Sequence, residues 1–397
     1  MIQFIIHGFT SIFRGSTTYW LWITLLLIVS LTGLNAWAIQ LAHGLSTTGM
    51  GDEVSWGMYI ANFVFLVGMA AAAVMMVIPA YIFKDKEMHK VVIMSELFAI
   101  AAMVMCILFV TVDIGRPDRL WHMIPRLGFF NFPSSMLSWD VLVLNGYLLL
   151  NFHVCFYVLY SKFRNRSPRP FLYIPIVFLA IAWAFSIHTI TAFLFQGLGG
   201  RPFWNSGLIA PRFLASAFAA GPSFMILVFL FLKKSGAISF DNTVINRIRV
   251  IVTISLLINI FFAGSEFFAE FYSDSKHVVH FSHLFGLHGE SMLAPWIWTA
   301  LSLNIGAAIF LLSPFRRNQT VLIISCLMII IGIWTEKGLG FVIPAFIPTT
   351  LGDFVQYVPS MNELKICFGV WAFGLLIYTL MLKGAIPIMN GQAVRKD

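Results

Sequence analysis

Charged residues are scarce in this chain of 397 residues. They make up 11% of the sequence, whereas hydrophobic residues make up 59%. A soluble globular protein carries about 25% charged residues, so an ordinary soluble domain is excluded. The net charge of +8 comes from basic residues that are spread over alternating loops. It therefore does not indicate a nucleic-acid-binding patch, and no nucleic acid partner is expected.

Cysteine is also scarce, and its spacing excludes the common electron-carrying motifs. The four cysteines lie far apart in apolar segments at Cys106, Cys155, Cys326 and Cys367. No CxxC, CxxCH or ferredoxin-like spacing is present, so the chain has no recognisable motif for an iron–sulfur cluster or a c-type haem. If the chain handles electrons, another subunit must carry them.

The sequence contains no Ser/Gly-rich or charge-rich linker, which predicts a single integral membrane domain over residues 1–397. The start of the chain does not have the pattern of a cleavable signal, because Arg14 follows the apolar residues instead of preceding them. Residues 1–18 are predicted to lie along the membrane interface.

Long hydrophobic stretches dominate what is present. A helix needs about 20 apolar residues to cross the bilayer core. Ten stretches meet this length, at 19–41, 56–83, 91–113, 135–158, 171–194, 210–232, 248–270, 293–313, 320–341 and 362–382. The sequence therefore predicts an all-α polytopic membrane protein with ten transmembrane helices.

A weak internal duplication accompanies these spans. Ile60, Phe65 and Gly68 in the second span recur at the same offsets as Phe213, Phe218 and Gly221 in the sixth. An offset of four helices is what parallel repeats require. The pattern suggests two four-helix bundles plus two C-terminal helices.

Lysine and arginine set the predicted orientation. The two tails and the loops after the second, fourth, sixth and eighth spans hold 17 basic residues, and the remaining loops hold 7. Because cytoplasmic loops carry the excess of Lys and Arg, both termini are predicted to be cytoplasmic. The opposite, outer face then has long loops rich in Pro, Gly and Trp, at 113–121, 198–204, 277–288 and 342–363. Such loops favour either a docking surface or a capped ligand pocket.

Polar residues inside the spans predict a site near the outer face. A rise of about 1.5 Å per residue places one set of them in a shared outer layer, and Glu96 about 25 Å from Asp113, near the inner side. The outer set is Asn62, Asp113, Asp140, His188, Glu266 and Glu336. Intramembrane ionisable groups usually serve a ligand or an ion pathway. A quinone headgroup would suit this layer, since it needs hydrogen-bond partners and a group that exchanges protons.

Each of these residues also has a purely structural interpretation. Asp113 and Arg116 can form an interfacial ion pair, and Asp140 can stay hydrated near the interface. Glu266 and Glu270 share one helical face, where two buried charges are unfavourable, so one of them would be solvated or protonated. The remaining residues can form interhelical hydrogen bonds, as for Asn62 and His188, or extend toward the inner surface, as for Glu96.

The histidines do not predict a haem or a metal site. His153 and His188 differ in depth by more than about 15 Å, too far for two ligands of one iron. His277, His280, His283 and His288 lie in an outer loop. No cysteine or carboxylate completes a tight set of ligands there, so no metal site is predicted.

Several motifs resemble those of one membrane-subunit family. The runs VDIGRPDRLW, SSMLSWDVLVLNGYLLLN (134–151) and SIHTITAFL with GLGGRPFW (186–204) resemble the polysulfide-reductase membrane-subunit family, NrfD-like. The segments at 48–68 and 351–374 are most similar to its ten-helix branch, which includes membrane subunits of the Dsr and Hmc redox complexes. The resemblance covers nearly the whole chain.

The resemblance implies a multi-pass subunit of the cytoplasmic (inner) membrane that has no haem or iron–sulfur cluster of its own. Such a subunit binds menaquinone or menaquinol near the extracytoplasmic face. It exchanges electrons with an extracytoplasmic ferredoxin-type iron–sulfur subunit, in a complex with haem-containing redox subunits that serves sulfur or sulfate metabolism. Asp113, Asp140 and His188 match motif positions that are associated with the quinone site.

We therefore expect Asp113, His188 and Asp140 to be catalytic, with Asp113 and His188 accepting quinol protons. Asn62 would orient the ring, Arg116 would steady the carboxylate, and Trp139 and Trp204 complete the predicted quinone-binding set. Glu96, Glu266, Glu270 and Glu336 form a predicted proton pathway. The alternative from another class is a secondary transporter or ion channel, which ten spans with a repeat would also suit.

Overall fold

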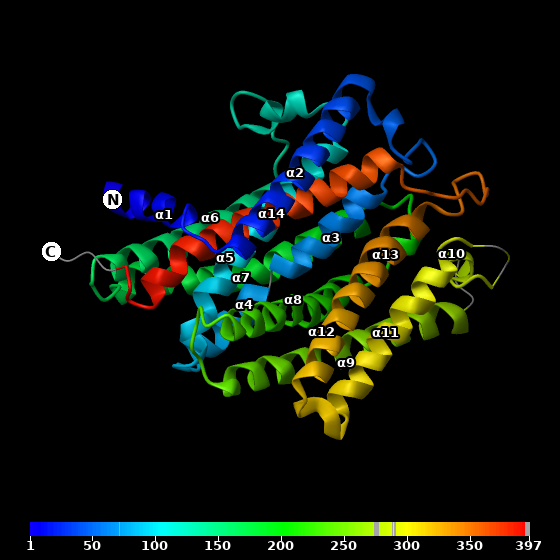
Figure 1. The fold of residues 1–397 in the computed structure, drawn as a ribbon. Coiled ribbons are helices and arrows are strands. Elements are labelled where there is room, and N and C mark those ends of the chain that lie inside the picture. The colour runs from blue at the N-terminus through cyan, green and yellow to red at the C-terminus, as the bar shows by residue number, and fades with distance from the viewer. Residues whose placement is uncertain (71, 274–277, 288, 290, 394–397) are drawn as a thin grey trace.

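The computed structural model describes residues 1–70, 72–273, 278–287, 289 and 291–393. Within these ranges the chain is helical and forms no β-strand, and ten helices are long and apolar enough to cross a membrane. The predicted all-α polytopic fold is confirmed (Figure 1). Met1 and the end of the last helix lie at the same end of the molecule, as an even number of crossings requires.

Each predicted span corresponds to one continuous or interrupted helix. In chain order they are α2 (Thr17–His43), α3 (Met58–Ala70) with α4 (Ala72–Val77) and the π-helical turn η2 (Ile78–Ile82), α5 (Met88–Asp113), α6 (Met136–Phe163), α7 (Pro170–Gln196), α8 (Ile209–Lys234), α9 (Asn242–Tyr272), α11 (Ala294–Leu312), α12 (Gln319–Ile333) with the π-helical turn η6 (Trp334–Leu339), and α14 (Met361–Met389). Short helices α1 (Ile2–Ile12), α10 (Val278–Leu284) and α13 (Gly340–Val342) complete the set. Short 3-10 turns join several of them, η3 (Pro117–Met123), η4 (Pro202–Trp204), η5 (Pro314–Arg317) and η7 (Ile343–Phe346) among them.

Local signals in the sequence explain where several helices begin. Ser16, Asp241 and Asn318 each accept a hydrogen bond from a backbone N–H in the first turn that follows. Ser360 does the same for the N–H of Glu363. A side-chain oxygen at this position satisfies one of the donors that the first turn leaves unpaired. These caps place the starts of α2, α9, α12 and α14.

The ten crossings pack as two groups of four plus one pair (Figure 1). The first group is formed by α3–α4, α5, α6 and α7, and the second by α8, α9, α11 and α12. The two remaining helices, α2 and α14, pack against each other. The prediction that the extra pair consists of the last two helices of the chain is therefore wrong, because the pair is formed by the first span and the last.

Close contacts at small residues join the two groups. A Cβ at Gly221 of α8 would lie 2.6 Å from the Cβ of Ala72, and a Cβ at Gly68 of α3 would lie 3.5 Å from the Cα of Ala217. Both glycines belong to the weak internal duplication. The matching positions in the second and sixth spans therefore meet at the interface between the two groups, where small residues let helices approach closely.

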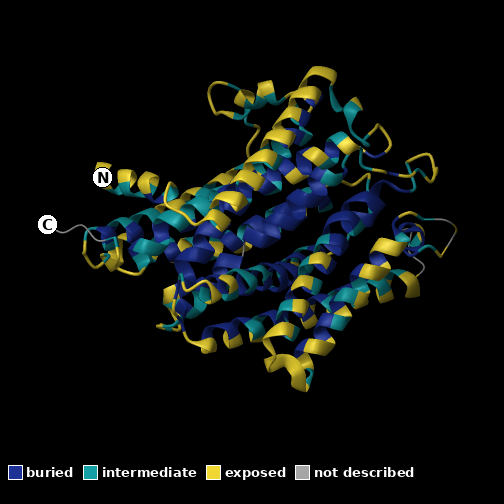
Figure 2. Ribbon diagram, viewed as in Figure 1, coloured by how far each residue is buried: buried dark blue, intermediate teal, exposed yellow. Residues whose placement is uncertain are grey.

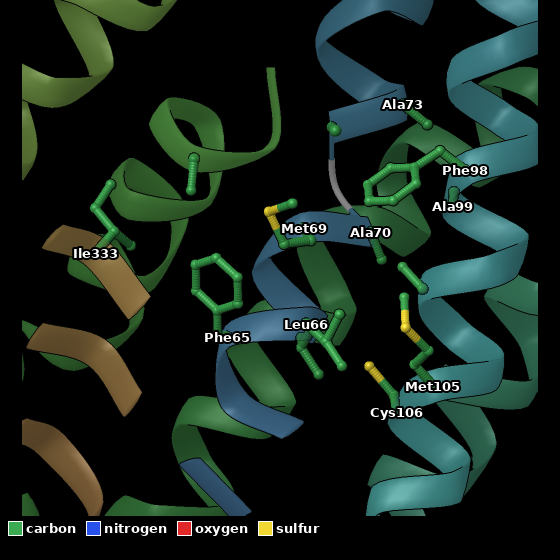
Figure 3. Packing of buried hydrophobic residues seen from close by; sticks show 14 of the residues in the cluster. Phe65, Leu66, Met69, Ala70, Ala73, Phe98, Ala99, Met105, Cys106 and Ile333 are labelled. Carbon is green, nitrogen blue, oxygen red and sulfur yellow. The ribbon is translucent and has the colours of Figure 1, made fainter. Parts of the chain in front are cut away.

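The centre of the molecule is formed by α3, α5 and α8. Their side chains are largely buried, whereas α2, α7 and α9 present large exposed apolar side chains at the periphery (Figure 2). Figure 3 shows Phe65 of α3 on the side of Ile333, and Leu66 on the side of Met105 and Cys106 of α5. An apolar exterior around a packed apolar core is the pattern of a protein that is surrounded by lipid.

The N-terminal helix α1 packs against α6 and α14. The ring of Phe4 makes edge contacts with Phe156, Tyr160 and Phe163 at centroid distances of 5.4 to 5.6 Å. The opposite side of α1 exposes Ile2, Ile6 and Phe9, among others. This face is consistent with the predicted position along a membrane interface, which stays a prediction.

Candidate functional site

The neighbouring helices α6 and α7 each bury one of the predicted catalytic residues, Asp140 and His188. The hydroxyl of Thr191 on α7 donates a hydrogen bond of 2.8 Å to Oδ1 of Asp140 on α6. His188 lies one turn before Thr191, and its Nδ1 is 2.8 Å from the carbonyl oxygen of Ala184. Its Nε2 is buried and has no protein partner. Asp140 and His188 therefore point into the protein and not into lipid.

A hollow of about 430 Å³ opens at the C-terminal end of α7. It is lined by Ser55, Trp56, the 197–201 segment, Trp204 and Phe346. The guanidinium of Arg201 lies over the ring of Phe346 at 4.3 Å. The hollow is apolar with one cation at its edge, a composition that suits a flat ring with polar ends.

Aromatic rings separate this hollow from the Asp140 and His188 pair. Phe195 is one turn beyond Thr191, and its ring lies 5.0 Å from that of Trp204 and 5.5 Å from that of Trp56. Trp204 is fully buried, and its Nε1 donates 2.9 Å to the carbonyl oxygen of Phe341. Trp204 is thus a fixed wall of the hollow, and its place in the quinone-binding set stays a prediction.

Asp113 belongs to a second polar network, where the C-terminal ends of α2 and α5 meet the N-terminal ends of α3 and α14. Its carboxylate is buried, Oδ1 has no hydrogen-bond partner, and it interacts electrostatically with Glu363 and Tyr59. The Tyr59 hydroxyl donates 2.6 Å to Oε1 of Gln40, whose Nε2 donates 2.6 Å to the carbonyl oxygen of Val112. The predicted catalytic residues are therefore divided between two networks.

Glu363 organises this second network and was not predicted. Its carboxylate accepts 3.0 Å bonds from the backbone N–H groups of Gly49 and Met58, and a further bond from the Tyr357 hydroxyl. Burial, followed by the Glu363 carboxylate, raises the pKa of Tyr357, so the phenol stays protonated and donates. The S-x-x-E spacing of Ser360 and Glu363 is a capping-box signature that could have drawn attention to it.

The structure corrects the role expected for Arg116. Its guanidinium makes two hydrogen bonds to the carboxylate of Asp118, at 3.0 and 2.8 Å, and both side chains are more than half exposed. Helix α5 ends at Asp113, and the backbone is extended at Ile114. This change of direction separates Arg116 from the buried Asp113. Arg116 therefore forms a surface ion pair and does not steady the Asp113 carboxylate.

A third network is a buried ionic cluster in the second group of helices. Arg212 of α8 forms ion pairs with Glu266 of α9 and, at 2.7 Å, with Glu336 of η6. Glu336 also accepts 2.7 Å from Nδ2 of Asn304. One cation thus serves two carboxylates, which explains how the predicted pathway residues Glu266 and Glu336 are tolerated at membrane depth.

Lys337 is a second buried cation that the sequence prediction missed. Its Nζ donates 3.3 Å to the carbonyl oxygen of Phe213 and lies 4.3 Å above the ring of the same residue. Among the described residues it has no carboxylate within ion-pair distance. It acts electrostatically on His188 and on Arg212, and so lies between the first network and the third.

The π-helical turn η6 explains why Glu336 and Lys337 serve different networks. Neighbouring residues on this turn point Glu336 toward Arg212 and Lys337 toward Gly68 of α3, where a Cβ would lie 3.2 Å from Nζ. Such turns are frequent at functional sites. The seven basic residues assigned to the outer loops include Arg212 and Lys337, although both lie within the predicted spans 210–232 and 320–341; without them these loops hold five. The adjacent Glu336 and Lys337 within an apolar span were the feature of the sequence that could have indicated this site.

The other predicted residues occupy separate positions. Asn62 accepts bonds from the indoles of Trp334 (3.0 Å) and Trp371 (2.8 Å), so it has the interhelical role that was its structural alternative. The Trp139 indole donates 2.9 Å to the carbonyl of Pro133, at the start of α6. Glu96 is buried, and the Cys155 thiol donates to it at 3.6 Å. Glu270 is half-buried near the outer end of α9.

The outer histidines can be followed only in part. Nδ1 of His280 lies 3.0 and 2.8 Å from the carbonyl oxygens of Pro344 and Ile347. His283 is buried beside the ring of Phe354. His277 and His288 lie outside the described residues. In the described part of the chain, no three His, Cys, Asp or Glu side chains are grouped in a way that could hold a metal.

Comparison with known proteins identifies the family. Residues 46–344 match the family described as "Polysulphide reductase, NrfD". The chain belongs to this family. The matched range contains Asp113, Asp140 and His188, as well as Arg212 and Lys337. The resemblance inferred from the motifs is confirmed at this level.

Similar proteins are membrane subunits of reductases. A putative membrane subunit of a dimethyl sulfoxide reductase from Halobacterium salinarum is 24% identical, with 94% of this chain and 91% of that protein aligned. The integral membrane subunit of a menaquinone reductase from Nitratidesulfovibrio vulgaris is 23% identical, over 94% of this chain and 93% of that protein. An Hdr-like menaquinol oxidoreductase integral membrane subunit from Archaeoglobus fulgidus is 22% identical over 64% of this chain and 61% of its own length.

Proposed function

We propose that this chain is the quinone-reactive integral membrane subunit of a multi-subunit respiratory oxidoreductase. It exchanges electrons between menaquinol, its substrate, and an extracytoplasmic iron–sulfur partner subunit. The observation that carries the proposal is that Asp140 and His188 are both buried, on the neighbouring helices α6 and α7, with an unpartnered Nε2, and that Phe195, one turn beyond Thr191, packs against two aromatic residues that line a hollow. The names of two relatives, a menaquinone reductase and a menaquinol oxidoreductase, support the substrate class.

The proposed chemistry is proton transfer linked to electron removal. Oxidation of a quinol to a quinone releases two electrons and two protons. The electrons pass to the partner. The two protons pass to the carboxylate of Asp140 and to Nε2 of His188 when the ring of Phe195, which separates them from the hollow, moves aside. Thr191 orients the carboxylate through its hydrogen bond, and Trp56, Phe195 and Trp204 exclude water from the ring.

Asp113 has a different place in this proposal. Because it lies in the network of Glu363 and Tyr59, apart from Asp140, it does not take a third proton from the quinol but receives one of the two protons after Asp140 or His188 has accepted it. Its unpartnered Oδ1 leaves room for that role. Glu96, Glu266, Glu270 and Glu336 remain the proposed proton pathway, to which Arg212 and Lys337 are added as the cations that hold it.

The partners and location follow from the same proposal. The outer loops around the aromatic hollow dock the ferredoxin-type iron–sulfur subunit, and haem-containing subunits complete a complex for sulfur or sulfate metabolism. The membrane is the cytoplasmic one, with both termini in the cytoplasm. A secondary transporter would purify alone, whereas the proposed redox protein co-purifies with iron–sulfur and haem proteins.

Substitution in the assembled complex tests the site. Asp140→Asn and His188→Gln each keep the approximate shape of the side chain while changing its proton chemistry. We expect each to lower the rate of menaquinol-dependent reduction of the partner by about a hundredfold or more, the range of general acid–base catalysis. Asp118→Asn, on the exposed ion pair, is the control and should have no such effect. Unchanged turnover in both site variants and in Asp113→Asn would remove the basis of the proposal.

A further inference from the structure

A cluster of arginines lies at the end of the molecule that holds both termini. Nη1 of Arg249 on α9 donates 2.9 Å to the carbonyl oxygen of Arg316 in η5. This bond joins η5 to the first turns of α9, and the guanidinium of Arg249 interacts electrostatically with Arg316 and Arg317. We propose that these three arginines bind the phosphate headgroup of an anionic phospholipid.

The cluster carries positive charge that the described side chains do not neutralise. The nearby ion pair joins Arg247 to Asp85, and none of Arg249, Arg316 and Arg317 pairs with a described carboxylate. Like charges at close range repel unless an anion lies between them. A phosphodiester matches the fork of donors on a guanidinium, because two of its oxygens can accept at once.

An amphipathic hollow adjoins the cluster. It has a volume of about 760 Å³ and lies between the end of the second crossing and the first turns of α9. Its polar side is supplied by Arg249, Asn246, Thr243 and the ion pair of Arg247 with Asp85, whose carboxylate is neutralised there, and its apolar side by Pro79, Phe83, Val250 and Ile251. Phe83 and Val250 are exposed, as is Ile254 one turn further along α9. A headgroup with an attached acyl chain fits both sides at once.

The length of α9 puts the arginines at headgroup depth. The helix has 31 residues, about 46 Å, whereas the hydrocarbon core is only about 30 Å thick. An overhang shared equally by the two ends is about 8 Å, and Arg249 lies about 10 Å from the start of the helix, close to the boundary of the core. From there its long side chain reaches the phosphates.

The excess of Lys and Arg that orients a membrane protein does not by itself account for the cluster. It requires basic residues on one side of the membrane, but it does not require three of them to lie close together. Elsewhere at the same end Lys90 pairs with Glu87, and Lys233 donates to Asn242. Arg164, Arg166 and Arg169 also lack a described carboxylate partner, but no described side-chain bond draws them together as the bond of Arg249 does. The continuous apolar wall favours a lipid over an acidic segment of a partner protein, which would leave Phe83 and Val250 uncovered.

Lipid retention by the purified protein tests the proposal. We compare the triple variant Arg249→Gln, Arg316→Gln, Arg317→Gln with Arg164→Gln, Arg166→Gln, Arg169→Gln, which removes the same charge from the loop between α6 and α7. Native mass spectrometry after purification in mild detergent counts bound phosphatidylglycerol and cardiolipin. We expect about a tenfold loss of anionic lipid in the first variant and no loss in the second.

Reconstitution supplies the second measurement. Phosphatidylglycerol nanodiscs should raise the unfolding temperature of the wild type above that in phosphatidylcholine nanodiscs, and the cluster variant should lose this difference. If the triple variant does not fold, Arg316→Gln with Arg317→Gln changes only exposed side chains and must still lower retention. Equal retention in cluster and control variants, equal loss in both, or an acidic protein bound in place of lipid would overturn the proposal.

Discussion

Asp140 depends on a single residue of the neighbouring helix for its orientation. The Thr191 hydroxyl donates to it across the α6–α7 contact, while Thr189, two residues earlier, donates to the carbonyl of Phe185 in its own helix. Both threonines lie on α7, but Thr191 bonds a side chain of another helix and Thr189 bonds the backbone of its own helix. They therefore make a matched pair for testing the site.

We expect Thr191→Val to lower the turnover number with menaquinol by about tenfold, because a loss of about 1.4 kcal/mol of transition-state stabilisation has that effect. The free energy of unfolding should fall by only about 1 kcal/mol. Steady-state kinetics and thermal unfolding in detergent measure the two quantities. Thr189→Val is the control, and an equal loss of turnover in both variants would contradict the role given to Asp140.

The two buried cations should respond in opposite ways to removal of their charge. Arg212→Met leaves Glu266 and Glu336 without their partner, at a cost of about 3–5 kcal/mol of unfolding free energy. Lys337→Met removes a charge that no described carboxylate pairs, so stability should be unchanged or higher while turnover falls. Thermal unfolding and turnover of both variants test this. Equal destabilisation would show that Lys337 has a purely structural role.

At the scale of the element, the α2–α14 pair rests on a glycine contact. A Cβ at Gly33 of α2 would lie 2.5 Å from the Cα of Gly369 of α14. No flexible side chain can move aside there, because the nearest atoms belong to the backbone. At Gly264 of α9, by contrast, a Cβ would meet no atom within 4 Å.

Gly33→Ala should therefore destabilise the protein by about 1–3 kcal/mol, since the helices must move apart. Gly264→Ala should be neutral or stabilising by up to about 1 kcal/mol, the gain in helix propensity. Both substitutions bring the same gain in helix propensity, so the difference between their unfolding free energies measures the effect of the close contact at Gly33. Thermal unfolding in detergent measures it, and a Gly33→Ala variant as stable as Gly264→Ala would mean that α2 is loosely held.

At the scale of the whole molecule, the orientation in the membrane remains a prediction. The four native cysteines are buried, so a maleimide should label them little, and labelling will report on an introduced cysteine. Asp52→Cys reports on the outer face and Ser167→Cys on the opposite face, and both positions are exposed. In intact cells a membrane-impermeant maleimide should label the first and label the second only after lysis. The reverse pattern would place the termini outside.

Local composition determined much of this protein. Ten spans, an all-α fold and a family resemblance could be predicted because hydrophobic length and short motifs are properties of contiguous residues. The depth argument gave Asp140 and His188 a position along their helices, but it did not decide that both side chains are buried. The partners of these residues could not be predicted in the same way. The position of Asp113 along its helix placed it in the predicted layer, but it lies near Glu363 because α5 packs against α14.

Contacts between distant residues were decided by the tertiary structure alone. The sequence placed Arg116 three residues from Asp113, yet a helix end separates them, and Arg116 pairs with Asp118. Arg212 and Lys337 were counted as loop charges, but they are buried because carboxylates and a carbonyl oxygen from other helices solvate them. Hydrophobicity decides that a segment enters the membrane. Which helices then pack together, and which charges they bring within bonding distance, depends on side-chain shape across the whole fold.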